Sequence, residues 1–535
     1  QAVQDLDNDS LTSQRLLMNG VDHLEAQEDL LQVAAALNDK LPEGETVKQS
    51  TLREYIEDVR QEVEASGLKL ENLSGEMRHG VSNNLLQGTL SAWTPLKREN
   101  VIAQSRLELL LEPFYAILAL HSGNNALYDQ DKFRYLWKSL IKNHPHDSIC
   151  GCSCDRVHED NMNRFARIGD LSKRMLKGAF GELFARLDRS DMDKSEYLLA
   201  VFNPSPSVLS AVVPAKLYLP LDEDISAIQI CDPEGREVAF TVEKVRKRFL
   251  AVFPAINLPG KTPCHEVDIL LETEKLPSLG YRIYRVKPHA GTALSVIPHK
   301  SLTGDNVLEN DKLKVTVNPA GRVAISDKAN GAEYSDCVSF IDEADIGHSY
   351  NFFPAPDGKV IDISAQAEIK VERLMQSAIR DTVKVSYRCR LPVEYNFEKR
   401  CPSSETADFL LTAVYSLDRF SNRLDIQVTV DNASFEHRIR AVFRPGIVTD
   451  DSLASVPFGF ISRSCRESHN GIRHSGNQPN SGIVSVNDGN HCFTVYNEGL
   501  FEYEHLVSGE ITLTLLRSVR RITNSDYPDQ EDFVA

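Results

Sequence analysis

The stretch NHPHDSICGCSC, residues 143–154, lies between two strongly amphipathic helical patterns. It holds two histidines, one carboxylate and three cysteines within twelve residues. Pro145 stiffens the stretch, which lowers the entropy lost when its side chains are ordered. Such a loop either builds a metal or substrate site or only connects two helices, and the spacing alone leaves both interpretations open.

Helical periodicity extends from this loop in both directions. Before it, apolar residues spaced three and four apart predict one helix from Thr94 to Ser122 and a second over residues 133–141. After it, the same spacing predicts a third helix that begins near Asp155. Three helices with short links are typical of an antiparallel bundle, which we place at residues 93–190.

The first 92 residues combine strand and helix signals. The apolar run at residues 16–18 stops at an Asn-Gly pair and predicts a short buried strand. Helical periodicity follows over residues 26–38, and Thr51 with Glu54 forms a capping-box pattern that opens another helix. These signals predict an α/β layer within residues 1–92.

The pattern changes to period two after Glu196, and many short strands follow, separated by turn sequences. This spacing predicts β-sandwich domains over residues 191–535. The fold class is therefore a multidomain α+β protein: an α/β layer, a three-helix bundle, then β-sandwich domains. A chain of 535 residues is long enough for several such cores.

Charge and composition exclude several classes of partner. The formal net charge of −18 argues against nucleic acid and anionic membranes, because both require basic surfaces. The sequence has no run of about 18 apolar residues that could span a membrane, and its first residues carry no signal-peptide pattern. Seven of the ten cysteines are scattered singly, which favours free thiols and a cytoplasmic location. A neutral substrate fits this charge, and a homo-oligomer stays open.

His146 and Asp147 are the first candidates for chemistry. An imidazole is a good Zn²⁺ ligand, and an adjacent carboxylate can orient ligands or bind sugar hydroxyls. One histidine makes no site, since zinc takes three or four protein ligands in most cases. The C-x-C-x-C pattern at residues 150–154 lacks zinc-knuckle spacing and favours packed free thiols. His158, inside the third helix, is predicted to lie on a solvated face.

Asp22 and Arg78 are further candidates. Asp22 follows the predicted strand and would lie at the carboxyl edge of the sheet, where ligands collect, so it is either a general acid/base or a helix N-cap. Arg78 lies in a glycine-flanked polar loop, where a surface turn is favoured over a substrate contact. The polar loop with Asp342, Asp345 and Tyr350 is predicted to be solvated, with contact to a neighbouring domain as the alternative.

Three motifs together resemble those of glycoside hydrolase family 38, the α-mannosidases, in its bacterial branch. They are NHPHDSI at residues 143–149, MNGVDH at 18–23 and SGEMR at 74–78. Residues 308–315 and 515–519 resemble its sandwich segments. The resemblance implies that residues 1–92 are the C-terminal part, a remnant, of an α/β catalytic domain. It also implies the three-helix bundle, the β-sandwiches and a Zn²⁺ ion that binds the mannose hydroxyls.

The resemblance also implies roles for single residues. His146 would be a zinc ligand, Asp147 would contact sugar hydroxyls, and Asp22 would be the general acid/base. Tyr350 would face the sugar, and Arg78 lies in a segment similar to an active-site loop. No segment matches the family's H-x-D zinc ligands or its nucleophilic Asp, so we expect this chain to be a portion of a longer enzyme that carries them elsewhere.

The expected function is that of a retaining, exo-acting α-mannosidase on a mannose-containing oligosaccharide or glycoside. Such an enzyme holds its nucleophile and its acid/base roughly 5–5.5 Å apart and passes through a glycosyl-enzyme. Two alternatives stay open. The chain is a non-catalytic carbohydrate-binding or assembly fragment, or it hydrolyses a phosphorylated mannosyl-glycerate, for which Arg78 is the candidate phosphate contact.

Overall fold

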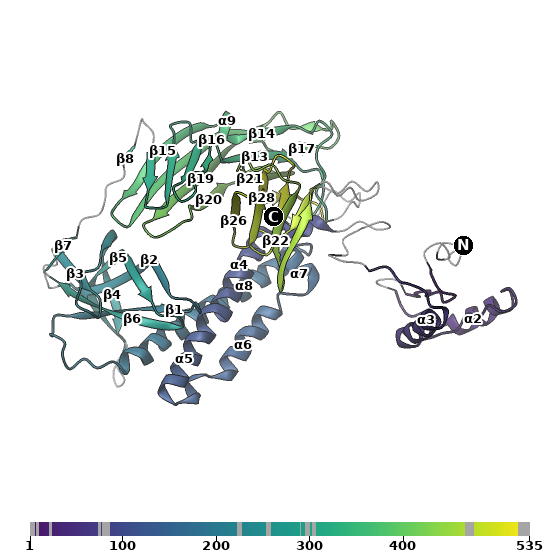
Figure 1. The fold of residues 1–535 in the computed structure, drawn as a ribbon, viewed down its shortest axis with the longest axis horizontal. Helices are drawn as coiled ribbons and strands as arrows, with labels where there is room; N and C mark the ends of the chain where they lie inside the picture. Colours follow the sequence, from purple (N-terminus) through teal and green to yellow (C-terminus); the bar gives the residue numbers. More distant parts are fainter. Residues whose placement is uncertain are drawn as a thin grey trace. The chain divides into compact units, whose positions relative to one another are not determined.

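The computed structural model describes residues 6, 10–20, 24–72, 76, 86–221, 227–252, 258–288, 290–294, 300–301, 306–465 and 476–522. The chain forms two compact units, unit 1 at residues 1–77 and unit 2 at residues 78–535. Figure 1 shows that the helices come early in the chain and the strands follow them. The predicted multidomain α+β fold class is confirmed.

Unit 1 contains helices α2 (Leu30–Asn38) and α3 (Leu52–Ser66). The Thr51 hydroxyl accepts a hydrogen bond from the Glu54 amide at 3.2 Å, as the capping pattern predicts. The buried strand predicted at residues 16–18 is wrong: Leu17 and Met18 are 43% and 76% exposed, and the segment has no strand pairing. An apolar run becomes a strand only where another strand pairs with it, and the described part of unit 1 contains none.

Unit 2 begins with helices. α4 (Thr94–Ser105), the π-helical turn η2 (Arg106–Leu111) and α5 (Glu112–Ser122) run on without a break, and α6 (Gln130–Ile141) and α8 (Asp155–Ala185) follow. Pro113 explains the π turn, because it lacks the amide proton that a regular helix needs at that position. The shorter helices are η1 (Gln87–Leu90), η3 (Asn125–Leu127), α7 (His146–Cys150) and α9 (Ile363–Gln366).

The core of the helical part joins the elements that the apolar periodicity predicts. α4 and η2 contribute Leu96 and Leu107, α6 contributes Leu136, and α8 contributes Phe165 and Ile168, all buried together. Figure 1 shows α6 and α8 lying alongside the α4–α5 helix. The short α7 sits in the connection between α6 and α8. The candidate loop is therefore held between two elements of one packed core.

The first strands after α8 form two antiparallel sheets that share a core containing Leu217, Ile230 and Val267. One sheet has the order β1 (Tyr197–Asn203), β6 (Gly280–Pro288), β3 (Ala227–Cys231) and β7 (Thr292–Ala293). The other has the order β2 (Leu209–Pro220), β5 (Gly260–Leu276) and β4 (Phe240–Val252).

The remaining strands form larger antiparallel sheets around a second core that contains Val315, Phe340 and Tyr415. One sheet has the order β12 (Glu333–Tyr334), β11 (Val323–Asp327), β10 (Leu313–Val317) and β9 (Asn306–Glu309). The next has the order β20 (Asp425–Asp431), β19 (Thr406–Asp418), β16 (Arg380–Pro392), β15 (Glu368–Gln376) and β8 (Lys300–Ser301).

A six-stranded sheet has the order β14 (Val360–Asp362), β13 (Val338–Ala344), β21 (His437–Phe443), β28 (Ile511–Ser518), β27 (Glu502–His505) and β24 (Asn477–Pro479). The last four-stranded sheet has the order β23 (Gly459–Ser464), β22 (Asp451–Val456), β25 (Ile483–Asn487) and β26 (Cys492–Tyr496). A hairpin is formed by β17 (Tyr395–Asn396) and β18 (Cys401–Pro402). The domain boundaries predicted at residues 92 and 190 stay predictions.

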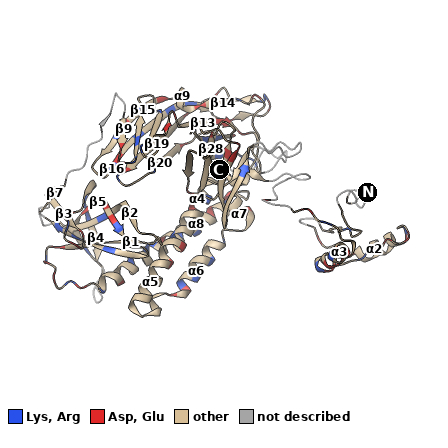
Figure 2. Cartoon of the chain, in the orientation of Figure 1, with Lys and Arg blue, Asp and Glu red and all other residues tan. Residues whose placement is uncertain are grey.

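Acidic and basic residues occur together along the helices and strands (Figure 2). Exposed pairs such as Arg186 with Glu182, 2.6 Å apart, contribute at most about 1 kcal/mol each. Within the described part of the chain, no helix combines the length and the apolar character needed to cross a membrane.

Candidate active site

The loop at residues 143–154 folds as one short helical turn with anchored ends. At its start, the buried Asn143 amide donates to the Asn161 carbonyl at 3.2 Å, and Arg164 donates to the Asn143 side chain at 3.1 Å. α7 follows Pro145, and Gly151 ends it with a left-handed φ of 75°. The loop is therefore fixed in place at both ends by the bundle.

His146 and Asp147 occupy the first turn of α7 and remain open to solvent. Their side chains are 89% and 56% exposed, and the His146 Nε2 atom lies 3.5 Å from the Asp147 Oδ1 atom. The adjacent His144 is bound instead, with Nε2 2.7 Å from the Asn100 side-chain oxygen. Of the two histidines in this loop, only His146 has a ring that is free to bind a metal or a substrate.

Lys97, on α4, holds the C-terminal end of α7 by hydrogen bonds. Its buried ammonium donates to the carbonyls of Ile149 at 3.0 Å and Cys150 at 3.1 Å, and also to the Ala92 carbonyl. Burial lowers the pKa of Lys97 from 10.5 to about 8. These bonds satisfy carbonyls at the end of α7 that would otherwise lack a donor, so Lys97 sets the position of the turn that carries His146.

The pKa values of Cys150 and Cys152 are shifted in opposite directions. A hydrogen bond from Cys152, with help from the charge of Lys97, lowers the pKa of Cys150 from 9.0 to about 6. The same hydrogen bond, together with burial, raises the pKa of Cys152. The Cys152 sulfur also lies 3.6 Å from the Asp147 carboxylate. The prediction of packed thiols is confirmed for the buried Cys152, but it is wrong for Cys154, which is exposed because the chain turns outward before α8.

The structure brings Tyr350 to this loop from nearly 200 positions later in the sequence. Its hydroxyl forms a hydrogen bond with Cys152, and burial, that bond and the nearby charge of Asp147 raise the pKa of Tyr350. The Tyr350 carbonyl accepts from the Gly88 amide at 2.7 Å. Two of the predicted substrate contacts, Asp147 and Tyr350, therefore lie in one place, and their roles stay predictions.

The loop that contains Tyr350 is not solvated, and that prediction is wrong. Asp342 and Asp345 are buried, since each carboxylate has a cationic or imidazole partner on another strand. Asp345 pairs with Arg517 on β28 at 2.7 Å. The alternative, contact with a neighbouring domain, stays a prediction because the domain boundaries do.

Sequence reasoning missed Arg517, which holds this junction together. It is fully buried, and besides Asp345 it donates to the carbonyls of Gly88 at 2.9 Å and His348 at 3.0 Å. It thereby connects the segment before α4 to the loop that carries Tyr350. Its partner Asp345 is 172 positions away in the sequence, so no local spacing signal marks the pair.

His158 was predicted to lie on a solvated face, and the structure contradicts this. Its ring is fully buried, 4.6 Å from the ring of Trp93, and its Nε2 accepts from the Ser153 amide at 3.3 Å. Burial, with a smaller contribution from Lys97, lowers the pKa of His158 from 6.5 to about 4. His158 is a packing residue of the first turn of α8 and is unsuited to bind a metal.

This burial predicts a specific acid sensitivity. The unfolded chain binds a proton at His158 below pH 6.5, whereas the folded chain binds it only below about pH 4. The free energy of unfolding is therefore highest above pH 6.5, and it decreases as the pH falls from 6.5 towards 4. At about 1.36 kcal/mol per pKa unit, the loss approaches roughly 3 kcal/mol. Urea unfolding of the wild type and His158→Gln at pH 7 and pH 4.5 measures it.

We expect the pH-dependent loss to shrink in His158→Gln and to persist in His121→Gln, which changes an exposed histidine on α5. An equal pH dependence in the wild type and His158→Gln would contradict the assignment.

The described residues do not complete a metal site. Among them, no group of three or more His, Cys, Asp or Glu side chains could hold an ion. His146 offers one exposed imidazole of the kind that zinc takes. The predicted acid/base Asp22 and the predicted substrate contact Arg78 lie outside the described residues.

Comparison with known proteins shows which proteins this chain resembles. Residues 308–531 match the profile of the glycosyl hydrolases family 38 C-terminal domain. A Halalkalibacterium halodurans protein that carries the provisional name mannosylglycerate hydrolase is 27% identical over 97% of this chain and 60% of its own length.

Two solved structures resemble the fold. An α-mannosidase from Enterococcus faecalis V583 has a TM-score of 0.85 at 27% identity, over 98% of this chain and 62% of the other. A family 38 glycosyl hydrolase protein from Enterococcus faecalis has a TM-score of 0.80 at 26% identity, over 100% of this chain and 62% of the other. The chain thus spans about 60% of the length of these relatives. Residues 308–531 thus carry the glycosyl hydrolases family 38 C-terminal domain, and the chain is similar to an α-mannosidase and to a family 38 protein along nearly its whole length.

Proposed function

We propose that this protein is a retaining, exo-acting glycoside hydrolase that cleaves terminal α-mannosides. The observation that carries the proposal is that Asp147 and Tyr350 lie together at one loop. That loop belongs to a chain that aligns with an α-mannosidase over 98% of its length. A half-exposed carboxylate beside a phenol hydroxyl offers both an acceptor and a donor to the hydroxyls of a neutral sugar.

The proposed roles are those that the resemblance to family 38 implies for each side chain. Asp147 accepts hydrogen bonds from the mannose hydroxyls, and Tyr350 donates to the sugar. Asp22 protonates the leaving oxygen while a nucleophilic carboxylate bonds to the anomeric carbon, and Asp22 later takes a proton from the water that displaces this carboxylate, as the acid/base of a retaining glycosidase does. His146 is proposed as one ligand of a Zn²⁺ ion that would bind sugar hydroxyls.

Hydrolysis of an aryl α-mannoside by the full-length protein tests the proposal. We expect kcat/KM to fall by about 100-fold in His146→Ala and by about 10- to 100-fold in Asp147→Asn, because each loses a direct ligand or substrate contact. A chelator should lower wild-type activity and leave little further effect on His146→Ala.

His144→Gln is the matched control, since it changes a histidine of the same loop that already binds Asn100. Undiminished activity in both His146→Ala and Asp22→Asn would overturn these assignments.

A second candidate substrate comes from the name of the Halalkalibacterium relative. We propose mannosyl-glycerate, with or without a phosphate group, as the alternative to a mannose-containing oligosaccharide, with Arg78 as the contact to its anionic group. Comparing kcat/KM for an aryl α-mannoside and the two mannosyl-glycerates decides between them. If the chain binds mannosides but hydrolyses none of these, it is a carbohydrate-binding module instead.

The proposed location is the cytoplasm. All ten cysteines lie in the described part of the chain as free thiols, which fits a reducing compartment.

A further inference from the structure

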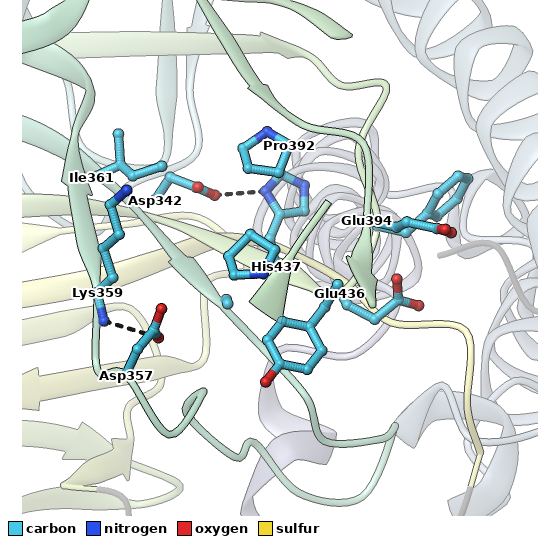
Figure 3. A pocket seen from close by; sticks show the side chains of 12 residues that line it. Asp342, Asp357, Lys359, Ile361, Pro392, Glu394, Glu436 and His437 are labelled. Atoms are coloured by element: carbon cyan, nitrogen blue, oxygen red, sulfur yellow. Dashed lines mark hydrogen bonds and ion pairs between the residues drawn. The ribbon is translucent and has the colours of Figure 1, made fainter. Parts of the chain in front are cut away.

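A polar pocket lies where β13, β14 and β21 meet the β17–β18 hairpin (Figure 3). Its lining shares no residue with the loop at 143–154 and does not include Tyr350. The residues that line it are Asp342, Ala344, Asp357, Lys359, Ile361, Pro392, Glu394, Tyr395, Pro402, Phe435, Glu436 and His437.

The floor of the pocket is a buried pair. His437 Nδ1 lies 2.6 Å from the Asp342 carboxylate, and Nε2 lies 3.0 Å from the side-chain oxygen of Asn432. Figure 3 shows the His437 ring and the Asp342 carboxylate facing each other across β13 and β21. Because each ring nitrogen has a partner within hydrogen-bonding distance, the His437 ring is held in place.

One wall is a pair of carboxylates held by an arginine. Arg520 contacts Glu394 at 2.7 Å and binds both oxygens of Glu436, at 2.7 and 2.8 Å. Its guanidinium also stacks 4.9 Å from the ring of Phe435. The wall therefore presents oriented acceptor oxygens whose charge Arg520 offsets, next to an apolar ring.

Tyr395 supplies an unused hydroxyl. The residue is only 4% exposed, and its hydroxyl has no hydrogen-bond partner among the described residues. Burying a hydroxyl without a partner costs free energy, so the group is set to bond with something that enters the pocket. At the rim, the exposed Asp357 and Lys359 add an acceptor and a donor.

The side chains that line the pocket determine which kind of ligand it can bind. The carboxylates of Asp342, Asp357, Glu394 and Glu436 disfavour an anion. The His437 ring faces the first of them, and Arg520 offsets the charge of the two glutamates. Carboxylate oxygens that accept, a phenol and an ammonium that donate, and the Phe435 ring suit a neutral molecule with many hydroxyl groups. We propose that this pocket is a second carbohydrate-binding site, which takes one neutral sugar residue and uses Tyr395 as a direct contact.

The test is a calorimetric titration of the full chain with methyl α-mannopyranoside in an Asp147→Ala background, which weakens binding at the loop. Tyr395→Phe removes only the hydroxyl, and we expect about 3- to 10-fold weaker binding. Asp357→Asn should weaken binding by a similar factor, from the rim. Tyr284→Phe is the matched control, because its buried hydroxyl also has no partner among the described residues and lies in another core.

Unchanged affinity in Tyr395→Phe, an equal loss in Tyr284→Phe, or no sugar binding in the Asp147→Ala background would each overturn the proposal. Tighter binding of a small alkylamine than of the sugar would also overturn it. Hydrolysis of an aryl α-mannoside by Tyr395→Phe with Asp147 intact should equal that of the wild type. The second site and the proposed activity can therefore fail independently.

Discussion

Replacing Arg517 with Met will lower the free energy of unfolding of unit 2 by about 3–5 kcal/mol, because it leaves a buried carboxylate without its partner. Arg517 and Asp345 are both fully buried, with Nε and Oδ2 2.7 Å apart. The same guanidinium also donates to the carbonyls of Gly88 and His348, which lose that bond in the variant but keep backbone donors. Burial prevents water from replacing any of these bonds, so the full desolvation cost remains.

Urea unfolding followed by circular dichroism measures the change. Arg186→Met is the control: Arg186 lies 2.6 Å from Glu182 with both side chains about 40% exposed, so its loss should cost at most about 1 kcal/mol. The double variant Arg517→Met with Asp345→Asn should recover part of the loss, because no unpaired charge remains buried. Equal losses in Arg517→Met and Arg186→Met would contradict this view of the junction.

The helical half of the fold could be predicted because its signals are local. Apolar spacing defined the helices, and Gly123 follows the last residue of α5 in the left-handed conformation that ends a helix. The strand predicted at residues 16–18 failed, because strand formation depends on a pairing partner and not on the segment itself. Likewise, nothing near Asp345 in the sequence indicates that Arg517 lies beside it.

The candidate site was predictable where side-chain type alone carries the signal. His146 and Asp147 stand out as a ligand pair in a stiff loop, and the structure leaves both exposed. Lys97 could not be found in this way, because a lysine on an amphipathic helix usually points to solvent. It is buried because the carbonyls of Ile149 and Cys150, more than 50 positions away, surround its ammonium.

Gly151→Ala will destabilise unit 2 by about 2–5 kcal/mol and displace the turn that carries His146 and Asp147. Gly151 has a φ of 75°, and a left-handed conformation costs a residue with a Cβ atom roughly 1–2 kcal/mol. The added Cβ would also lie 2.7 Å from the Trp93 Cβ and 2.9 Å from the Ala92 carbonyl oxygen. Neither neighbour is the end of a flexible side chain, so an overpacking cost of about 1–3 kcal/mol follows.

Gly123→Ala separates the two contributions. Gly123 also follows a helix, with a φ of 63°, but nothing lies within 4 Å of its added Cβ. It should lose only the roughly 1–2 kcal/mol of the left-handed conformation and keep its aryl α-mannoside hydrolysis. Gly151→Ala should lose more stability and also activity, because Lys97 holds the carbonyls of the same turn and the clash pushes that turn away. Equal unfolding free energies and equal kcat/KM in the two variants would mean that close packing under Gly151 does not position the loop.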